Sequence, residues 1–378
     1  MPRVCPLLLV LLLVSVPALA RLRAVRGTGD TSAAWLRLHH IADERLVDAA
    51  HGARIVAFGD ATHGTHELFA AKQRWIPLFA ARGYRTLALE APYAQMVALD
   101  RWLATGDGDP VALLRNPSYF FWNTDELLGL LQWARAQNVA GLTPPFRIAG
   151  VDATDPAEAA RLVIGAYPSL ADRYACIERN AASAGCRNEI ATIRPDLVAL
   201  GAADEVLHAA RVVEQGQEAL ARNFATRDAT MAENVEWLAA RDGRVLVWGH
   251  DVHWNRGTYA VVGPEPITAA GSYLHDAFFI GSVIGDGWFS SANAAGTQWL
   301  PQWRELDAPN GDDYALLFDA AAMNELLLPL ANAPEWLRGA HHYRIAGSSG
   351  GTFGVTADLA QQFDAVLYVK TSTPAHVR

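Results

Sequence analysis

Two carboxylates and two imidazoles fall within the eight residues from Asp60 to Glu67. The imidazoles belong to His63 and His66, and imidazole exchanges protons near neutral pH. An apolar run typical of a buried strand precedes this stretch, and a run typical of an amphipathic helix follows it. Titratable residues at such a turn favour a catalytic loop on an α/β scaffold. A helix N-terminus, with Thr65 as its cap and Glu67 favoured by the helix dipole, would explain these two residues but not the two histidines.

Acids and histidines also follow the three other strands predicted in this part of the chain. They are Glu90 after 85–89, Asp152 after 147–151, and His250 and His253 after 244–248. Ligands of open α/β sheets bind outside the carboxyl ends of the strands. With the loop after the strand predicted over 54–58, four strand ends therefore supply acids and imidazoles to one crevice. Capping of the helix that begins near Pro156 is an alternative for Asp152, and Thr154-Asp155-Pro156 is a good cap in its own right, which weakens the case for Asp152.

Short apolar strands that alternate with helical patterns predict an α/β fold. We expect a largely parallel central sheet with helices on both faces. Further predicted elements are a helix over 33–50, a helix over 68–79, and strands at 277–284, 314–318, 343–346 and 365–369. Residues 156–239 contain no comparable strand and predict a helical insertion. The α/β core would then consist of residues 21–155 and 240–378.

The first 20 residues have the pattern of a secretory signal peptide. Arg3 precedes an apolar run over 7–16, and small residues at 18–20 suit a cleavage site. The run is too short for a mature transmembrane helix, and an uncleaved N-terminal anchor is the alternative. We therefore expect a secreted or periplasmic protein with no stable membrane insertion after cleavage.

The charge of the chain limits which partners it can bind, and its cysteine content indicates the redox state of its compartment. The chain has 31 Lys and Arg residues against 40 Asp and Glu residues, which argues against nucleic acid or an anionic membrane as a partner. Cleavage of the signal peptide leaves Cys176 and Cys186, and an oxidising compartment favours a disulfide between them. Two free thiols or a redox pair are the alternatives. A structural zinc site is disfavoured, because two sulfurs without a nearby histidine are too few ligands.

Six blocks of the chain, in order, resemble those of the erythromycin esterase family, which also includes proteins of succinoglycan biosynthesis. The first, Gly59 to Glu67, is similar to the family's Gly-Glu-x-x-His-Gly signature with a Glu four residues after the His. The other blocks are the strand that ends in Glu90 and the segments 148–152, 227–238, 247–253 and 363–369. The resemblance covers about residues 35–372.

Two positions depart from the family pattern, and at a third the expected basic residue is a lysine. Asp60 stands where the family usually has Glu, and Asp251 stands where it usually has Asn. If Asp251 points toward the neighbouring histidines, its charge favours their protonated forms. Lys72 stands where relatives can carry Arg, and it offers a point charge instead of a planar fork.

The resemblance implies hydrolysis of a small-molecule ester or macrocyclic lactone by an activated water, without a metal ion. His63 is the candidate general base, because imidazole titrates near neutral pH. Glu90 or Asp60 would hold its tautomer and stabilise the imidazolium. His250 and His253 would polarise the carbonyl or protonate the leaving alkoxide.

Three further residues are predicted to support this chemistry. Glu67 and Asp152 would orient other groups, and Lys72 would neutralise clustered carboxylates or stabilise an oxyanion. A serine nucleophile is disfavoured because the chain has no Gly-x-Ser-x-Gly elbow.

Two other classes of function fit the same residues. A metal-dependent hydrolase would bind zinc or manganese through His63, Glu90, His250 and His253, with Asp60 as a further oxygen ligand. A non-catalytic exported protein of polysaccharide assembly would keep the scaffold without the reaction. Macrolide cleavage is the family's best-known activity, but export fits poorly with the protection of ribosomes inside the cell.

Overall fold

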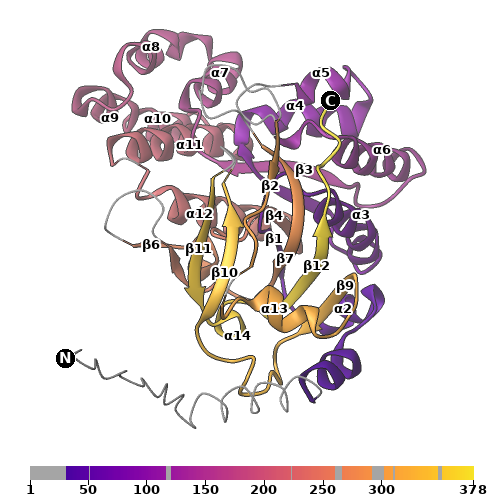
Figure 1. Cartoon of the computed structure of the whole chain (residues 1–378). Coiled ribbons are helices and arrows are strands. Elements are labelled where there is room, and N and C mark those ends of the chain that lie inside the picture. The colour runs from indigo at the N-terminus through magenta and orange to yellow at the C-terminus, as the bar shows by residue number, and fades with distance from the viewer. Residues whose placement is uncertain are drawn as a thin grey trace, which may run out of the picture.

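A mostly parallel β-sheet forms the centre of the computed structural model (Figure 1). The structure describes residues 31–50, 52–115, 121–222, 224–259, 266–291, 302–309, 311–347 and 351–378. The predicted signal peptide over 1–20 lies outside these residues. Among the described residues, no helix has both the length and the apolar character that crossing a membrane requires.

The four strands whose ends were predicted to carry the site are adjacent to one another in the sheet. In spatial order, the strands are β3 (Arg147–Asp152), β2 (Thr86–Pro92), β4 (Val245–His250), β1 (Ile55–Asp60), β7 (Ala277–Ser291), β12 (Ala365–Ser372) and β9 (Glu325–Pro329). Strands β3 to β12 pair in parallel, whereas β9 and β8 (Gln302–Glu305) run antiparallel to β12 and β7. All residues of β1, β2 and β4 are buried, as expected for strands covered on both faces.

Helices cover both faces of the sheet, which confirms the predicted α/β class (Figure 1). The helices outside the insertion are 31–39, α2 (Asp43–Ala49), α3 (His66–Ala81), α4 (Tyr93–Thr105), α5 (Pro110–Leu114), α6 (Asp125–Val139), α13 (Tyr314–Asp319) and α14 (Leu359–Gln362). The right-handed crossover rule puts α3 and α12 (Arg227–Asp242) on opposite faces. The chain moves one way along the sheet from β1 to β2 and the other way from β3 to β4.

Two predicted elements were wrong. The segment predicted as a strand over 314–318 is helix α13, because Asp313 caps it by accepting a hydrogen bond from the N–H of Ala315. The helix predicted over 33–50 is interrupted, because the N–H of Ile41 donates to the carbonyl of Leu327 in β9. In both places a local pattern was overridden by a hydrogen bond that periodicity does not reveal.

The described residues of 156–239 form helices joined by turns, with no strand among them, but these helices do not pack as one unit. The first part consists of α7 (Pro156–Ala166), η2 (Pro168–Leu170), α8 (Ala171–Asn180), α9 (Ala184–Ile190), α10 (Ile193–Ala199) and α11 (Asp204–Ala221). These elements share their own apolar cluster. Helix α12 instead contributes Met231, Val235 and Leu238 to the main core beside the sheet. Its N-terminus therefore has a fixed position relative to the strand ends.

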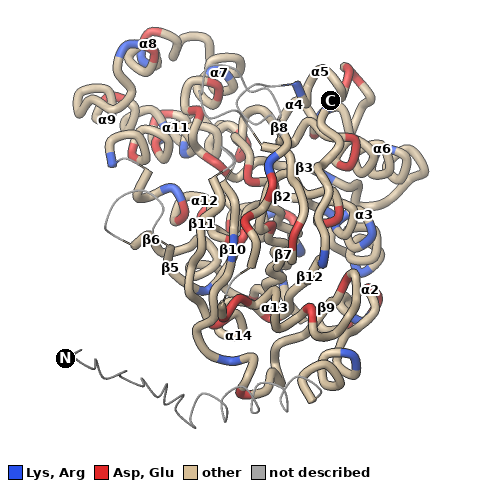
Figure 2. The backbone as a smooth tube through the Cα atoms, in the orientation of Figure 1, with Lys and Arg blue, Asp and Glu red and all other residues tan. Residues whose placement is uncertain are grey.

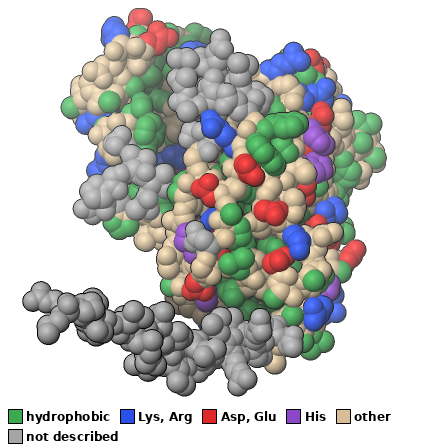
Figure 3. All heavy atoms as spheres, in the orientation of Figure 1, with side chains coloured by type: hydrophobic (Ala, Val, Ile, Leu, Met, Phe, Trp, Pro, Cys, Tyr) green, Lys and Arg blue, Asp and Glu red, His purple; other side chains and the backbone are tan. Residues whose placement is uncertain are grey.

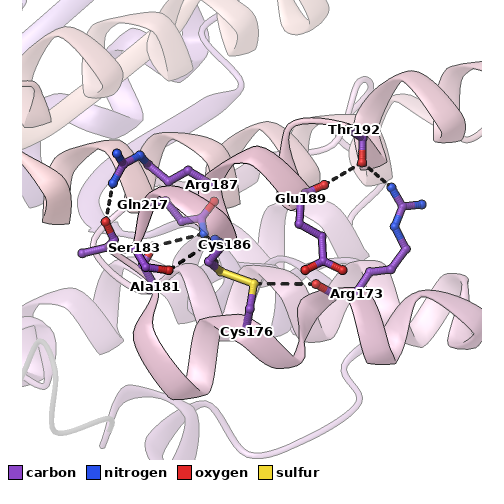
Figure 4. The surroundings of a disulfide bond; sticks show 10 residues. Arg173, Cys176, Ala181, Ser183, Cys186, Arg187, Glu189, Thr192 and Gln217 are labelled. Atoms are coloured by element: carbon purple, nitrogen blue, oxygen red, sulfur yellow. Dashed lines mark hydrogen bonds between the residues drawn. A yellow bond between two sulfur atoms is a disulfide. The ribbon is translucent and has the colours of Figure 1, made fainter.

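A disulfide joins Cys176 in α8 to Cys186 in α9, which confirms the predicted pairing (Figure 4). The two Cα atoms are 5.5 Å apart, and both residues are buried in the insertion's apolar cluster. Ser183 accepts a hydrogen bond from the N–H of Cys186 and caps α9. Gln217 of α11 donates to the sulfur of Cys186 over 3.0 Å, so the bridge also contacts the longest helix of the insertion.

We expect the double substitution Cys176→Ala and Cys186→Ala to lower the free energy of unfolding by about 3 kcal/mol, from loop closure in the unfolded chain. Urea denaturation followed by circular dichroism measures the change. The matched control is wild-type protein in reducing buffer, which should unfold at the midpoint of the variant. An unchanged midpoint in the variant would show that the bridge does not limit unfolding of the insertion.

Candidate active site

The carboxyl ends of four adjacent strands meet at one edge of the sheet, as the sequence predicted. Asp152, Glu90, His250 and Asp60 stand at the ends of β3, β2, β4 and β1, and each is at most 3 % exposed. Gly249 allows this approach, because a Cβ atom there would lie 2.6 Å from Oε2 of Glu90. The site is thus built on rigid strands and excludes water from its acids.

Glu90 is the centre of the site. Its Oε2 accepts a 2.7 Å hydrogen bond from the backbone N–H of His250, and its Oε1 accepts a 2.9 Å bond from Arg227. Nε2 of His63 lies 3.6 Å from Oε2, and Nε2 of His253 lies 3.3 Å from Oε1. Burial raises the pKa of Glu90, but His253 and Arg227 outweigh it and hold that pKa well below its usual range. Glu90 is therefore an ionised acceptor at neutral pH.

His63 is buried and held against aromatic rings. Its ring stacks on Phe121 with centroids 4.3 Å apart and meets the edge of His250 at 4.9 Å. Burial outweighs the attraction of Glu90 and lowers the pKa of His63 to about 3. Nδ1 is buried and has no hydrogen-bond partner among the described residues. A neutral imidazole with a free nitrogen is the form that a general base requires.

His250 is neutral and locked in one tautomer. Its Nε2–H donates to the carbonyl of Ala346 over 3.0 Å, and the N–H of Val252 donates to its Nδ1 over 3.2 Å. Burial lowers the pKa of His250 to about 4. Both nitrogens are thus engaged by the backbone. This arrangement suits a positioning role beside His63 better than proton donation or metal ligation.

His253 favours the protonated form, whereas His63 and His250 favour the neutral form. Its Nδ1 lies 2.8 Å from a carboxylate oxygen of Asp228, and its Nε2 lies close to Glu90. Burial lowers the pKa of His253, but the two carboxylates raise it to about 9. Arg227 lies 2.9 Å from the same Nε2 and opposes that charge, since a protonated nitrogen cannot accept its hydrogen. The attraction of the two carboxylates outweighs the repulsion from one guanidinium, so His253 is an imidazolium.

Two residues of the site were missed by the sequence reasoning. Arg227 donates to Asp152 over 2.6 and 2.9 Å and bridges it to Glu90. Asp228 accepts from the hydroxyl of Tyr259 over 2.5 Å and from the N–H of Ala270 over 3.0 Å, besides its contact with His253. Both residues begin helix α12. They are also the first two residues of the block at 227–238, so the resemblance contained the signal that strand ends alone did not.

Asp60 and Lys72 form a separate buried pair. Lys72 donates to one oxygen of Asp60 and to the carbonyl of Gly59 over 2.9 Å, and Trp248 donates to the other oxygen of Asp60 over 2.6 Å. Burial raises the pKa of Asp60, although Lys72 and Trp248 oppose the shift. These contacts join the end of β1 to α3. They leave neither oxygen of Asp60 free to hold the tautomer of His63, so Glu90 is the better candidate for that role.

Two other acids point away from the histidines. Oδ2 of Asp251 accepts hydrogen bonds from the hydroxyls of Tyr343 and Ser282, and burial raises the pKa of Asp251 to about 7. It therefore does not supply the charge that the sequence suggested beside His250. Glu67 accepts from the backbone N–H and the hydroxyl of Thr373, at 2.8 and 2.6 Å, and ties α3 to the C-terminal segment.

The four residues predicted as alternative metal ligands, His63, Glu90, His250 and His253, are not among the groups of described residues whose ligand atoms all lie within 4.8 Å of one another. Among the described residues, the His, Cys, Asp and Glu side chains that group in this way are those of His66, Glu126 and His376. Each of these offers one ligand atom, and the three atoms lie within 4.8 Å of one another. That group does not include the histidines of the strand ends. A metal bound through either ring nitrogen of His250 would have to displace the backbone hydrogen bond of that nitrogen.

Charge on the molecular surface is mixed. Figure 2 shows Lys and Arg residues spread over the insertion, the helices beside the sheet and the strands. The face in Figure 3 shows apolar, acidic and basic side chains side by side, with no broad basic patch among its described residues. This distribution agrees with the acidic composition of the chain.

The family model of erythromycin esterase matches residues 79–372. The chain therefore belongs to the erythromycin esterase family. The match begins after the loop from Asp60 to Glu67, so it rests on the later blocks. A curated relative, the Bacillus subtilis (strain 168) protein YbfO, which is a hydrolase by name, is 31% identical over 102 residues. That stretch spans 27% of this chain and 22% of the relative.

Solved structures of low sequence identity share the fold. A Bacillus cereus protein superposes with a TM-score of 0.78 at 23% identity and covers 93% of this chain and 99% of its own. A succinoglycan biosynthesis protein gives 0.72 at 17% identity, covering 88% and 92%. A mutant of the erythromycin esterase EreC in its open conformation gives 0.65 at 16% identity, covering 88% and 94%. These structures show the shared fold, and the family membership together with the relative named as a hydrolase supports a hydrolase or esterase-like function.

Proposed function

We propose that the protein cleaves a carboxylic ester or a lactone with a water molecule that His63 activates. One observation supports this most: His63 is a buried, neutral imidazole whose Nδ1 has no partner among the described residues. It stands where a parallel sheet of this class binds its ligands. His208 in the insertion also has a buried nitrogen without a partner among the described residues, so what distinguishes His63 is its position beside Glu90 and the ring of His250.

In this mechanism, His63 takes a proton from water as the water oxygen attacks the carbonyl carbon. Glu90 stabilises the imidazolium that forms, as the carboxylate of a Ser-His-Asp triad does. His253 and Arg227 place positive charge at the same edge of the sheet and would stabilise the tetrahedral oxyanion. The bond from the carbonyl carbon to the leaving oxygen then breaks. A proton from His253 completes the alcohol, and the other product is the carboxylic acid.

The pH dependence of kcat/KM should reveal the protonation states of His63 and His253. We expect kcat/KM to stay level as the pH falls through 6.5, because the pKa of His63 is lowered to about 3 and the base stays neutral. We expect kcat/KM to fall above about pH 9, where His253 loses its proton. Initial rates between pH 5 and about 10 measure this. In the variant His253→Gln, the decrease of kcat/KM at alkaline pH should disappear. A decrease of the wild-type kcat/KM below about pH 6.5 would contradict the role of His63 as a base with a lowered pKa.

We propose that hydrolysis needs no metal ion. The support is the backbone engagement of His250 and the ion-paired state of Glu90 and His253. The alternative is a zinc- or manganese-dependent hydrolase that uses the same residues. Protein dialysed against a strong chelator and checked by elemental analysis should keep its turnover. Turnover that disappears with the metal and returns when the metal is restored would favour the alternative.

The substrate class and the compartment are also proposals. A screen of esters, lactones and macrolides with the purified mature chain should find a compound that is hydrolysed, whereas a non-catalytic polysaccharide-assembly protein would hydrolyse none. Export is supported by the pattern of residues 1–20 and by the Cys176–Cys186 bridge. Cell fractionation and N-terminal sequencing of the mature protein would test it.

A further inference from the structure

Three segments far apart in the sequence bring two imidazoles and a carboxylate together outside the proposed active site. His66 begins α3, Glu126 lies in the first turn of α6, and His376 belongs to the C-terminal segment. Nδ1 of His66 is 2.6 Å from Oε1 of Glu126, and Nδ1 of His376 is 3.4 Å from the same oxygen. The two rings lie 4.6 Å apart. The end of the chain runs beside α6 and α3 (Figure 1).

The carboxylate of this group is buried but incompletely paired. Glu126 is 3 % exposed, and its Oε2 has no hydrogen-bond partner among the described residues. One oxygen of this carboxylate is thus left unsatisfied by the described part of the chain. Leaving such an atom without a partner costs about 1–3 kcal/mol.

The backbone holds the three side chains in place without using the nitrogens that would bind a ligand. The N–H of His66 donates to the carbonyl of Thr373 over 2.9 Å, and the N–H of Asp125 donates to the carbonyl of His376 over 2.9 Å. The N–H of His376 donates to Oε1 of Glu126 over 3.1 Å. The side chains of His66 and His376 are 34% and 60% exposed, so an ion can reach the group from solvent.

We propose that His66, Glu126 and His376 form a binding site for a divalent transition-metal ion of the zinc class. Two imidazole nitrogens and one carboxylate, with water in the fourth position, suit tetrahedral Zn²⁺. The ion would replace the His66–Glu126 hydrogen bond and bring the unsatisfied oxygen of Glu126 into its coordination sphere. Calcium and magnesium are disfavoured, because they prefer an all-oxygen set.

Such an ion would fasten the C-terminal segment to the loop that carries His63. The N–H of Ala375 donates to the carbonyl of Gly64 over 2.7 Å, and Thr65 forms a bridge with Pro374. Gly64 directly follows His63 in the chain. The site therefore has a structural role at the edge of the proposed catalytic loop, and its existence does not depend on what the protein hydrolyses.

Zinc titration of the full mature chain, carrying no added histidines and stripped of metal, tests the site by calorimetry. We expect one Zn²⁺ per chain and at least a tenfold weaker affinity in His376→Gln, which changes an exposed residue and should leave the fold intact. The matched control His341→Gln alters a histidine that pairs with Asp312 outside this group, and it should bind as the wild type does. Co²⁺ should give the visible absorption of a tetrahedral site in the wild type and lose it in His376→Gln.

Two results would overturn the proposal. One is the absence of Zn²⁺ binding by the wild-type chain. The other is equal binding by the wild type and by both His66→Gln and His376→Gln, which would place the ion elsewhere. Because these readouts are binding and absorption, they remain informative whether or not a hydrolysed substrate has been found.

Discussion

The substitution His63→Gln is expected to lower kcat by about a hundredfold to ten-thousandfold, which is the usual contribution of a general base. Glutamine has a similar reach but cannot accept a proton from water at neutral pH. KM should change little if His63 acts on the water and not on the substrate. Single-turnover rates with any substrate from the hydrolysis screen measure the effect.

His208 provides a matched control for this substitution. Like His63, it is buried, its pKa is lowered to about 3 by burial, and it stacks on an aromatic ring, that of Trp237, at 3.6 Å. It lies in α11 and packs against Tyr93 and Trp237, not against the side chains of the proposed site. His208→Gln should therefore destabilise the fold without a comparable loss of kcat. Equal losses in the two variants would attribute the effect of His63→Gln to folding, and full activity of His63→Gln would remove His63 as the base.

The substitution Glu90→Gln should damage both activity and stability. It removes the carboxylate that faces Arg227 and His253 and leaves their charges less compensated in a buried site. Breaking a buried ion pair from one side costs about 3–5 kcal/mol. The new amide group would also present N–H donors toward donors of His250 or Arg227. Urea denaturation measures the loss of stability, and we expect kcat to fall by at least about a hundredfold.

The pH profile separates an electrostatic role of Glu90 from a merely structural one. Glu90 helps to raise the pKa of His253 to about 9, so its neutralisation should move the alkaline limb to lower pH. Glu67→Gln is the control, because that carboxylate bonds to Thr373 near the surface. It should change stability by less than about 1 kcal/mol and leave the profile unchanged. An unshifted limb in Glu90→Gln would contradict the proposed coupling to His253.

The sequence predicted the parallel sheet and the meeting of its strand ends because both follow from local patterns. Buried runs such as those of β1 and β4 are apolar throughout, and polar residues follow each run. Adjacent parallel strands then bring Glu90, Asp152 and His250 to one edge. The strand predicted over 314–318 was wrong because a short apolar run suits either element, and the cap at Asp313 decides for a helix.

The partners of each side chain could not be predicted in the same way. The position of Asp60 after β1 placed it near His63, but only the fold shows that Lys72 and Trp248 take both of its oxygens. Arg227 reaches Asp152 across 75 positions of the chain, from the start of a helix that no strand-end argument considers. Strand ends identify which residues approach a site, whereas the atoms that remain free depend on packing.

The last residues of the chain have a practical consequence for handling the protein. The N–H of Ala375 bonds to Gly64, and Arg378 bonds through its N–H and its carbonyl to Asn123. A bulky tag fused after Arg378 that displaced residues 375–378 would remove the hydrogen bond between Ala375 and the loop that carries His63. Carboxypeptidase trimming during storage would release the same loop. Preparations should therefore carry any tag at the start of the mature chain, and mass spectrometry of the intact C-terminus should accompany each activity measurement.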